Sequence, residues 1–410
     1  MIAAVSFARE HELPLAVKGA GHNIAGSAIC DDGLVIDLSG LRAVDVDPGS
    51  RTVRVEPGAT LGDVDAATQE HGLALPLGIN STTGIAGLTL GGGFGWLSRK
   101  FGLTVDNLLA VEMVTADGAH VRASQAENPD LFWAIRGGGG NFGVVTAFQF
   151  QLHEVGPEVL AGLIVHPFDD ARSVMRHVRD AAADLPDELI AWMVLRKAPP
   201  LPFLPEEWHG REILVILAMY VGDIAEGEEA MRPLRAIGRP IADVVGPQPY
   251  VQWQQTLDPL LAPGARNYWK SHHLAELSDD AIDTLLDFAD RLPSDECEIV
   301  VVQLGGAVNR LRVDATAYPH RDTDFLMNIH IRWRSREDDD RCIAWTRDLF
   351  DAMVPHSTGG VYVNFMPADE VDRVRGAYGS NYDRLAEIKA VWDPDNVFRA
   401  NQNIRPSVPA

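Results

Sequence analysis

The chain has 410 residues, of which 46% are hydrophobic and 23% are charged, an ordinary composition for a globular protein of more than one domain. Its formal net charge of −23 argues against nucleic acid and anionic membranes as partners, because both attract clustered Lys and Arg. No apolar run reaches the ~18–20 residues of a membrane span. The opening residues carry charges at Arg9, Glu10 and Glu12 and do not resemble a secretory signal. Three widely spaced cysteines form no CxxC pair, so we expect neither a disulfide framework nor structural zinc, and we expect a cytoplasmic protein.

Residues 1 to about 155 are rich in glycine and in short runs typical of strands. Leu15–Lys18 and Leu34–Leu38 are short and apolar, and Thr52–Glu56 alternates between apolar and polar residues, so each predicts a strand. Leu61–His71 has apolar residues at helical spacing and is followed by a glycine, which predicts a helix. This mixture indicates an α+β fold rather than a regular βαβ repeat.

Residues from about 158 to 370 contain longer predicted elements. Strands are predicted over Ile213–Val221, Glu298–Leu304, Phe325–Trp333 and Val361–Phe365. Ser278–Leu292 predicts a helix that has Ser278 as its N-cap and buries one apolar face. The last stretch predicts a helix over Asn381–Val391, followed by a turn and a short extended end.

Two glycine-rich segments dominate the first region, Gly78–Gly95 (GINSTTGIAGLTLGGGFG) and Gly137–Gly143 (GGGGNFG). Glycine at this density lets the backbone approach a ligand closely, and the N–H groups of such loops can cradle a pyrophosphate. The second segment contains GxGxxG, but the following Val144–Leu152 alternates like a strand, whereas a dinucleotide fingerprint opens a helix. We therefore reject a Rossmann site, and the missing GxxxxGK[ST] excludes a P-loop. For either segment alone, tight turns between packed strands remain the structural alternative.

The segment Lys18–Gly26 (KGAGHNIAG) ends a strand in a turn of small residues that is followed by a single histidine. A lone histidine is more often structural than functional. Further segments follow in order: DDGLVIDLSGLRAV, TVRVEPGATLGDV, GLTLGGGFGWLSRKFGLTVDNL, NPDLFWAIRGGGGNFGVVTAF, YVNF and WDPDNVFRANQNI. Together they resemble the FAD-linked oxidases of the vanillyl-alcohol-oxidase superfamily, which share a PCMH-type FAD-binding domain. The most similar branch is the berberine-bridge-enzyme-like family, which includes 6-hydroxy-D-nicotine oxidase.

The resemblance implies an α+β fold with a two-lobed PCMH-type FAD-binding domain over residues 1–155. It further implies a substrate domain over 156–372, built on an antiparallel sheet covered by helices, and a berberine-bridge-enzyme-like C-terminal segment over 373–410 that returns to the FAD domain. Relatives have a further strand and helix before the histidine loop. Either the start is misassigned or this FAD domain lacks its N-terminal strand, and such a loss would expose a sheet edge.

The resemblance also implies that FAD is bonded through its 8α-methyl group to His22, which raises the flavin potential and prevents dissociation. Some members carry a second bond from a cysteine at the position of Asn80, so we predict a single attachment here. Thr83 falls near the position that admits or excludes O₂ and is not the residue expected there, which leaves oxidase and dehydrogenase both open. The other expected cofactor-binding residues are Gly19, Ala20, Gly21, Asn23, Thr82, Gly84, Gly87, Gly140, Asn141, Gly143, Val145, Asn401 and Asn403.

The substrate face is expected on strands of the middle domain, where alternation over Phe325–Trp333 places Leu326, Asn328, His330 and Arg332 on one face. In the family an acidic or amide base lies at or near the position of His330, which we therefore predict to be catalytic. A polar strand side that faces solvent is the structural alternative.

Tyr362 matches the family's tyrosine above the flavin and is the second predicted catalytic residue. A phenol of pKa ~10 is a poor base alone, so a neighbouring cation, Arg332 or Lys270, or the flavin would have to lower it. A core tyrosine is the structural alternative. Tyr268, Trp269 and Lys270 are expected to line the substrate cavity together with Arg332.

The predicted function is oxidation of a small organic alcohol, sugar or amine by hydride transfer to flavin N5. O₂ is the expected acceptor and gives H₂O₂. The alternatives are a dehydrogenase with another acceptor and a flavin-bearing, drug-binding protein without turnover. We expect no metal site, because HExxH is missing and the adjacent His272 and His273 point apart. The nucleophile motif GxSxG of the α/β-hydrolases is missing as well. The acidic run Glu337–Asp340 is read as a solvated helix start. Substrate identity and oligomeric state do not follow from the sequence.

Overall fold

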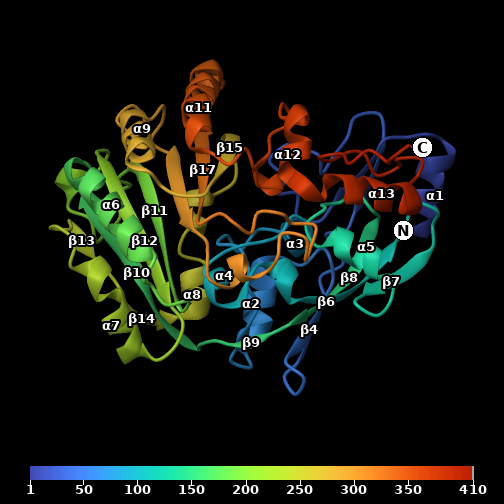
Figure 1. Ribbon diagram of the computed structural model, residues 1–410, viewed down its shortest axis with the longest axis horizontal. Helices are drawn as coiled ribbons and strands as arrows, with labels where there is room; N and C mark the ends of the chain where they lie inside the picture. The colour runs from blue at the N-terminus through green and yellow to red at the C-terminus, as the bar shows by residue number, and fades with distance from the viewer. Residues whose placement is uncertain (409–410) are drawn as a thin grey trace. The chain divides into compact units, whose positions relative to one another are not determined.

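The computed structural model describes residues 1–408, which form two compact units. Unit 1 comprises Met1–Glu154, Arg310–Arg321 and Tyr362–Ala410, and unit 2 comprises Val155–Asn309 and Asp322–Val361. Both units combine helices with mostly antiparallel sheets, which confirms the predicted α+β class (Figure 1). The short helix α10 (Ala307–Arg310) ends where the inserted segment of unit 1 begins.

Unit 1 contains a five-stranded antiparallel sheet with the strand order β3-β4-β8-β6-β7. Two strand pairs accompany it, the parallel pair β1–β2 and the antiparallel pair β5–β9. The strands are β1 (Leu15–Lys18), β2 (Leu34–Asp37), β3 (Val44–Asp47), β4 (Thr52–Val55), β5 (Leu73–Ala74), β6 (Leu108–Val114), β7 (His120–Ser124), β8 (Val144–Gln151) and β9 (His153–Glu154). These strands confirm the predictions over Leu15–Lys18, Leu34–Leu38, Thr52–Glu56 and Val144–Leu152. Because the strand β8, and not a helix, follows the GxGxxG, the structure supports the rejection of a Rossmann site.

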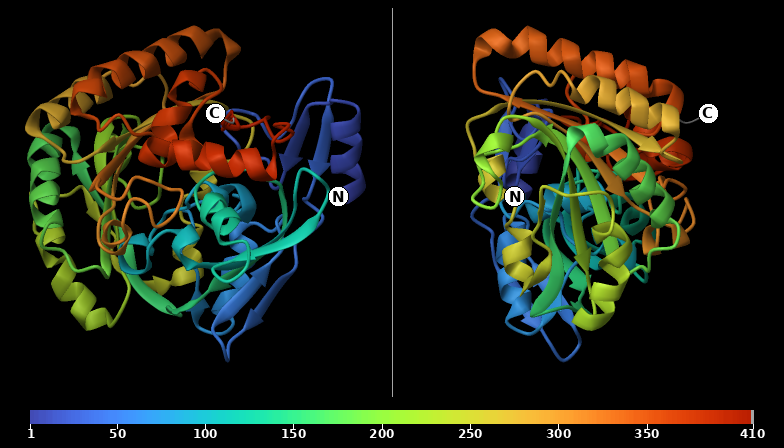
Figure 2. Two further views of the ribbon diagram at one scale, coloured as in Figure 1. Left: turned by 45° about the vertical axis from the view of Figure 1, so that its right-hand side comes forward. Right: turned by 90° about the vertical axis from the view of Figure 1, so that its left-hand side faces the viewer.

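The helices of unit 1 are short. They are α1 (Ile2–Glu10), α2 (Leu61–Gln69), α3 (Ile85–Leu90), α4 (Ser98–Phe101), α5 (Pro129–Ile135), α12 (Val374–Tyr378) and α13 (Tyr382–Trp392), with 3₁₀ turns η1 (Thr104–Asn107), η7 (Val363–Phe365), η8 (Val371–Arg373) and η9 (Gly379–Asn381). α2 begins at a capping box in which the Thr60 hydroxyl accepts from the Asp63 N–H and the Asp63 carboxylate accepts from the Thr60 N–H. α1 lies beside β1 and β2 and packs Val5 and Ala8 into their core (Figure 2).

Unit 2 is built on an antiparallel sheet with the order β13-β10-β12-β11-β16-β17-β15, and β14 also pairs with β10. Its strands are β10 (Glu158–Pro167), β11 (Leu189–Lys197), β12 (Glu212–Tyr220), β13 (Ala242–Asp243), β14 (Gly246–Pro249), β15 (Arg266–Leu274), β16 (Glu298–Gln303) and β17 (Phe325–Trp333). Its other elements are α6 (Ala171–Ala182), α7 (Ile224–Arg235), α8 (Tyr250–Gln254), α9 (Asp279–Ala289), α11 (Asp339–Met353) and the 3₁₀ turns η2 (Phe168–Asp170), η3 (Glu206–Trp208), η4 (Asp258–Leu261), η5 (Arg336–Asp338) and η6 (Val354–His356).

The two faces of this sheet differ. Helices α6, α9 and α11 lie side by side over one face, where alternate strand residues such as Met193, Ile216 and Ile329 are fully buried (Figure 1). Ser278 caps α9 as predicted, since its hydroxyl accepts from the Ala281 N–H. The opposite face of β17 carries the buried polar side chains Asn328, His330 and Arg332, so this strand is apolar on one face and polar on the other.

The strand predicted over Val361–Phe365 is wrong. The segment has no partner strand and forms the 3₁₀ turn η7 after an extended Tyr362. The alternating pattern that suggested a strand instead directs Tyr362 and Asn364 towards backbone groups of the first glycine-rich segment. Tertiary contacts therefore overrode the local β propensity. Among residues 1–408, no helix combines the length and apolar character needed to cross a membrane.

Candidate functional site

The histidine loop of unit 1 follows β1 directly. Gly21 has φ +78°, a left-handed conformation that turns the chain before His22. Asn23 stabilises the loop, because its carboxamide oxygen accepts from both the N–H and the hydroxyl of Ser27 at 3.1 Å. The His22 ring is exposed, and its Nε2 lies 3.1 Å from the Thr82 hydroxyl. The loop therefore presents a positioned imidazole to solvent.

The turn Asn80–Gly84 meets this loop. The Asn80 carboxamide oxygen accepts from the Thr82 N–H at 2.9 Å and from its hydroxyl at 2.7 Å. A Cβ on Gly84 would lie 2.9 Å from Ala20, so only glycine allows the two backbones to approach this closely. The structure thus brings His22, Asn80 and Thr82 together from two segments that the sequence separates by about 60 residues.

The second glycine-rich segment is joined to the C-terminal segment. Asn141 is fully buried; its amide donates to the carbonyls of Gly138 and Gln402, and its oxygen accepts from the Ile404 N–H. Asn401 donates to the Gly140 carbonyl at 3.1 Å. The C-terminal residues therefore return to unit 1 beside the GGGGNFG segment. Packing alone explains the glycine at position 143, because a Cβ there would lie 2.5 Å from the Val114 carbonyl oxygen.

Several features of unit 1 fit a dinucleotide such as FAD. Gly87 is exposed in α3, and a Cβ there would meet no atom within 4 Å, so open space adjoins the backbone. The carboxamide oxygens of Asn401 and Asn403 are buried and have no hydrogen-bond partner among residues 1–408. Gly140 also adjoins open space, since a Cβ there would lie 3.9 Å from its nearest neighbour, the Asn401 amide. At Gly19 the space is closed, because a Cβ would lie 3.1 Å from the Pro57 carbonyl oxygen, and Val145 is buried in β8. Buried acceptors without partners are costly, which favours a ligand that supplies donors.

Tyr362 belongs to unit 1 and contacts the glycine tract Gly91–Gly93. Its Oη accepts from the Gly93 N–H at 3.0 Å and from the Asn364 amide at 3.0 Å. The same Asn364 amide donates to the Leu88 carbonyl at 3.2 Å, and a Cβ on Gly91 would collide with its side chain. Glycine at this position is therefore required by the group that orients the tyrosine.

Burial raises the pKa of Tyr362 to about 12, although hydrogen bonds from Gly93 and Asn364 oppose this rise. The ring packs against Phe94 and Phe365, with centroid distances of 4.9 Å to each. Tyr318, from the inserted segment of unit 1, lies 6.4 Å away, and burial also raises its pKa. Tyr362 is thus a protonated phenol at neutral pH, held in an aromatic cluster.

His330 lies on the polar face of unit 2. Its Nδ1 is 2.6 Å from the Glu298 carboxylate, which also accepts from Arg196 at 2.8 Å. Burial favours a raised pKa for Glu298, but Arg196, His330 and Arg332 outweigh it and lower the pKa to about 2. The Trp269 ring stands edge-on to His330 at 4.3 Å. Since His330 is 5% exposed, the solvent-facing alternative for this strand side is not supported.

The four residues expected to line the substrate cavity do not lie on one face of the sheet. β15 alternates, so Lys270 points to the helix-covered face, where its ammonium lies 4.2 Å from the Phe350 ring centre. Tyr268 shares that face and contacts Arg347 of α11 at 3.2 Å, while Trp269 points to the His330 side. Grouping Tyr268 and Lys270 with Trp269 and Arg332 was therefore wrong, because adjacent residues of a strand project to opposite faces.

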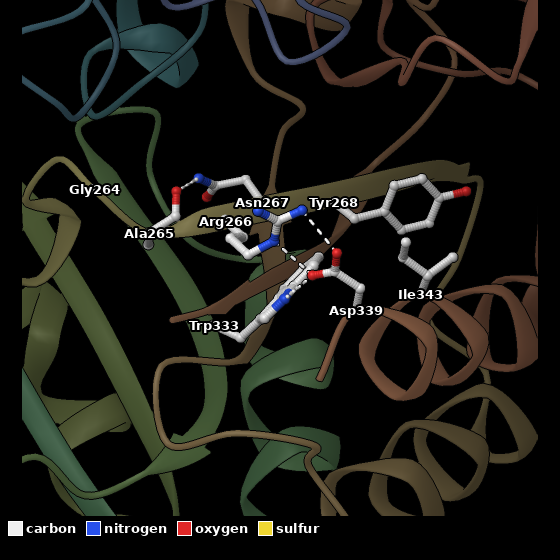
Figure 3. Close-up of a pocket in the computed structure, with 8 residues that line it drawn as sticks. All are labelled: Gly264, Ala265, Arg266, Asn267, Tyr268, Trp333, Asp339 and Ile343. Carbon is white, nitrogen blue, oxygen red and sulfur yellow. Dashed lines mark hydrogen bonds and ion pairs between the residues drawn. The ribbon is translucent and has the colours of Figure 1, made fainter. Parts of the chain in front are cut away.

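Tyr268 instead borders a surface pocket of about 460 Å³ at the end of β15 (Figure 3). Within it Arg266 binds Asp339 through two nitrogens, and the Trp333 indole donates to the same carboxylate at 2.7 Å. The lining residues are Gly264, Ala265, Arg266, Asn267, Tyr268, Trp333, Asp339 and Ile343. Asp339, from the acidic run, is thus tied into this pocket.

The remaining polar residues of β17 are also buried. Arg332 donates to the Ala262 carbonyl at 2.8 Å and lies 3.8 Å from Glu296. The Asn328 carboxamide oxygen has no hydrogen-bond partner within residues 1–408. His272 stacks on Phe350 and His273 contacts Thr323, so the two histidines point apart as predicted. Across the described chain, no three His, Cys, Asp or Glu side chains gather as a metal ion requires.

Sequence reasoning missed four groups that contact the candidate catalytic residues: Arg196, Glu298, Gly93 and Asn364. For two of them a signal existed, because Arg196 and Glu298 are charged residues at the ends of otherwise apolar strands. No local pattern marked Gly93 or Asn364 as partners of Tyr362. Their contacts join residues about 270 positions apart.

Comparisons with known proteins agree with this arrangement. Residues 1–124 match the family described as FAD binding domain, and residues 361–405 match the family described as berberine and berberine like. The chain is 33% identical over 410 residues to an FAD-linked oxidoreductase of Dictyostelium discoideum, covering 99% of this chain and 86% of the relative. It is 27% identical over 426 residues to (R)-6-hydroxynicotine oxidase of Paenarthrobacter nicotinovorans, with 98% and 88% covered.

The solved structure of 6-hydroxy-D-nicotine oxidase from Arthrobacter nicotinovorans superposes with a TM-score of 0.87 at 26% identity, covering 99% of this chain and 90% of that one. The predicted resemblance and the FAD cofactor are thereby confirmed. The chain belongs to the berberine-bridge-enzyme-like family of FAD-linked oxidoreductases.

Proposed function

We propose that the chain binds one FAD covalently through His22 and oxidises a small organic substrate with it. The observation that carries this proposal is the exposed His22 ring, positioned 3.1 Å from Thr82 at the junction of two segments of the FAD-binding unit. Asn80 offers no thiol for a second bond. Bound FAD would supply a hydride acceptor at N5 and pass the electrons on to O₂.

The substrate in this proposal is an alcohol, a sugar or an amine with a C–H bond next to the O–H or N–H group. His330, paired with the Glu298 carboxylate, is suited to take the proton from that group. Tyr362 stays protonated at neutral pH because its pKa is about 12, so its phenol is suited to act as a hydrogen-bond donor rather than as a base. Relatives named as oxidases of 6-hydroxynicotine and of aclacinomycin differ in substrate, which supports this breadth.

The covalent bond is tested on the folded, purified protein. We expect a band that fluoresces yellow on a denaturing gel after acid precipitation, with an intact mass increased by one FAD. His22→Ala should lose the fluorescence, whereas His120→Ala, which changes an exposed histidine on β7, should retain it. A His22→Ala protein that still carries covalent flavin would refute the attachment.

O₂ is the proposed electron acceptor. Stopped-flow mixing of the reduced protein with aerated buffer should show rapid flavin reoxidation and formation of H₂O₂. Slow reoxidation would instead identify a dehydrogenase, the alternative that Thr83 leaves open. Screening alcohols, sugars and amines for anaerobic flavin bleaching would then identify the substrate class.

A further inference from the structure

A row of four side chains crosses four neighbouring strands of unit 2. Arg196 of β11 lies opposite Glu298 of β16, and Glu298 lies opposite His330 of β17. His330 in turn lies opposite Trp269 of β15. Directly opposed residues project to the same face, so the side chains of this row can contact in sequence across the sheet.

The contacts along the row determine where the protons are. Arg196 has only donors, and it donates to one Glu298 oxygen at 2.8 Å. The other Glu298 oxygen lies 2.6 Å from His330 Nδ1. A carboxylate that is ionised at neutral pH can only accept, and the low pKa of Glu298 agrees with that state. Nδ1 must therefore carry the proton.

The other ring nitrogen is left as an acceptor. In the neutral imidazole only one nitrogen is protonated, so Nε2 keeps its lone pair. This Nε2 is buried and has no hydrogen-bond partner in the part of the chain that the structure describes. Asn328 lies two residues away on the same strand face, and its buried carboxamide oxygen also has no partner within residues 1–408. Two such acceptors on one face favour a ligand that brings O–H or N–H donors.

We propose that Glu298 and Arg196 are positioning residues that fix the tautomer of His330, so that Nε2 accepts the O–H or N–H proton of the substrate. This inference rests on the proposed function, which supplies the oxidant. Bound FAD would supply the acceptor for the hydride that leaves the substrate carbon, and the electron pair of the broken O–H or N–H bond would form the new C=O or C=N bond. The proton passes to Nε2, and the resulting imidazolium is stabilised by the Glu298 carboxylate.

The other charged groups near the row have different partners. Arg332 binds the Ala262 carbonyl, and Glu296 binds Arg334 at 2.6 Å and lies 3.8 Å from Arg332. Glu296→Gln therefore removes a nearby carboxylate without changing a contact of His330. It is the matched control for Glu298→Gln.

The test measures the His330 tautomer by long-range ¹H–¹⁵N NMR on protein labelled with [¹⁵N]histidine, with the signal assigned by its loss in His330→Gln. The wild type should show a protonated Nδ1 and an unprotonated Nε2. In Glu298→Gln the amide oxygen should turn to Arg196, which has only donors, and the NH₂ group should face Nδ1. The proton should then move to Nε2, whereas Glu296→Gln should keep the wild-type tautomer.

A second measurement links the tautomer to the reaction. Anaerobic flavin reduction should slow by about 10²–10⁴-fold in Glu298→Gln, the range that general-base catalysis contributes, although the flavin content of this variant should stay unchanged. In Glu296→Gln the rate of flavin reduction should equal that of the wild type. A wild-type protein protonated on Nε2, which can be observed even if Glu298→Gln fails to fold, would overturn the proposal. A moved proton without slower reduction would also overturn it. Protein without FAD would contradict the proposed function instead, since the tautomer is measured independently of the flavin.

Discussion

Replacing Lys389 by Met should destabilise unit 1, because the substitution removes one partner of a buried ion pair. Lys389 and Asp393 lie one helical turn apart at the end of α13, 2.6 Å from each other, and both side chains are fully buried. The Lys389 ammonium also donates to the carbonyls of Asn141 at 2.6 Å and Phe398 at 2.9 Å. It thus connects α13, the GGGGNFG segment and the C-terminal segment.

The magnitude follows from what the substitution leaves unpaired. Methionine preserves most of the volume but leaves a buried carboxylate and two carbonyls without their cation, which costs about 3–5 kcal/mol. Asp393 still accepts from the N–H groups of Val397 and Phe398 at 2.7 and 2.9 Å, so we expect about 3 kcal/mol. For a unit of this size that corresponds to a melting temperature about 6–12 °C lower. Burial lowers the pKa of Lys389, against the opposing effect of Asp393, which shows that desolvation of the ammonium is substantial.

The assay is thermal unfolding of the flavin-loaded protein, followed by tryptophan fluorescence. Lys18→Met is the matched control, because Lys18 forms an ion pair with Asp37 that is exposed to solvent, and such pairs contribute little to stability. The double variant Lys389→Met with Asp393→Asn should recover part of the loss, since it removes the unpaired charge. If Lys389→Met melted no lower than Lys18→Met, the reasoning would be refuted.

Three further predictions concern acid stability and the glycine positions. The stability that Glu298 contributes is fully present above its ordinary pKa of 4.5 and is lost as the pH falls towards its folded value of about 2. Between pH 6 and pH 3 this loss amounts to about 2 kcal/mol, so urea unfolding at these two pH values should show a pH dependence that is smaller by about that amount in Glu298→Gln. Gly84→Ala should lower both melting temperature and flavin content, because its Cβ would lie 2.9 Å from Ala20; an unchanged melting curve would contradict this. Gly87→Ala should retain the fold, or gain up to about 1 kcal/mol from helix propensity, yet bind less flavin, and a normal ratio of flavin to protein absorbance would argue against a cradle there.

The sequence by itself determined the family and those elements whose signals are local. Local periodicity predicted the strand Phe325–Trp333 and the Ser278 cap, because these depend only on residues within the same element. The order of the glycine-rich and C-terminal segments was sufficient to identify the family that the comparisons confirm. Alternation also placed Asn328, His330 and Arg332 on one face. The same alternation argued against grouping Lys270 with Trp269, so that error was avoidable.

Only the tertiary structure decided which distant residues meet. Arg196, Glu298 and His330 become neighbours through the register of three strands, and register is fixed by packing of the whole helix-covered face. The segment around Tyr362 turned away from its local strand preference because Gly93 and Asn364 provide hydrogen bonds that a strand would not allow. A sequence pattern encodes the face of each element, but the contacts between elements arise from the packing of residues hundreds of positions apart.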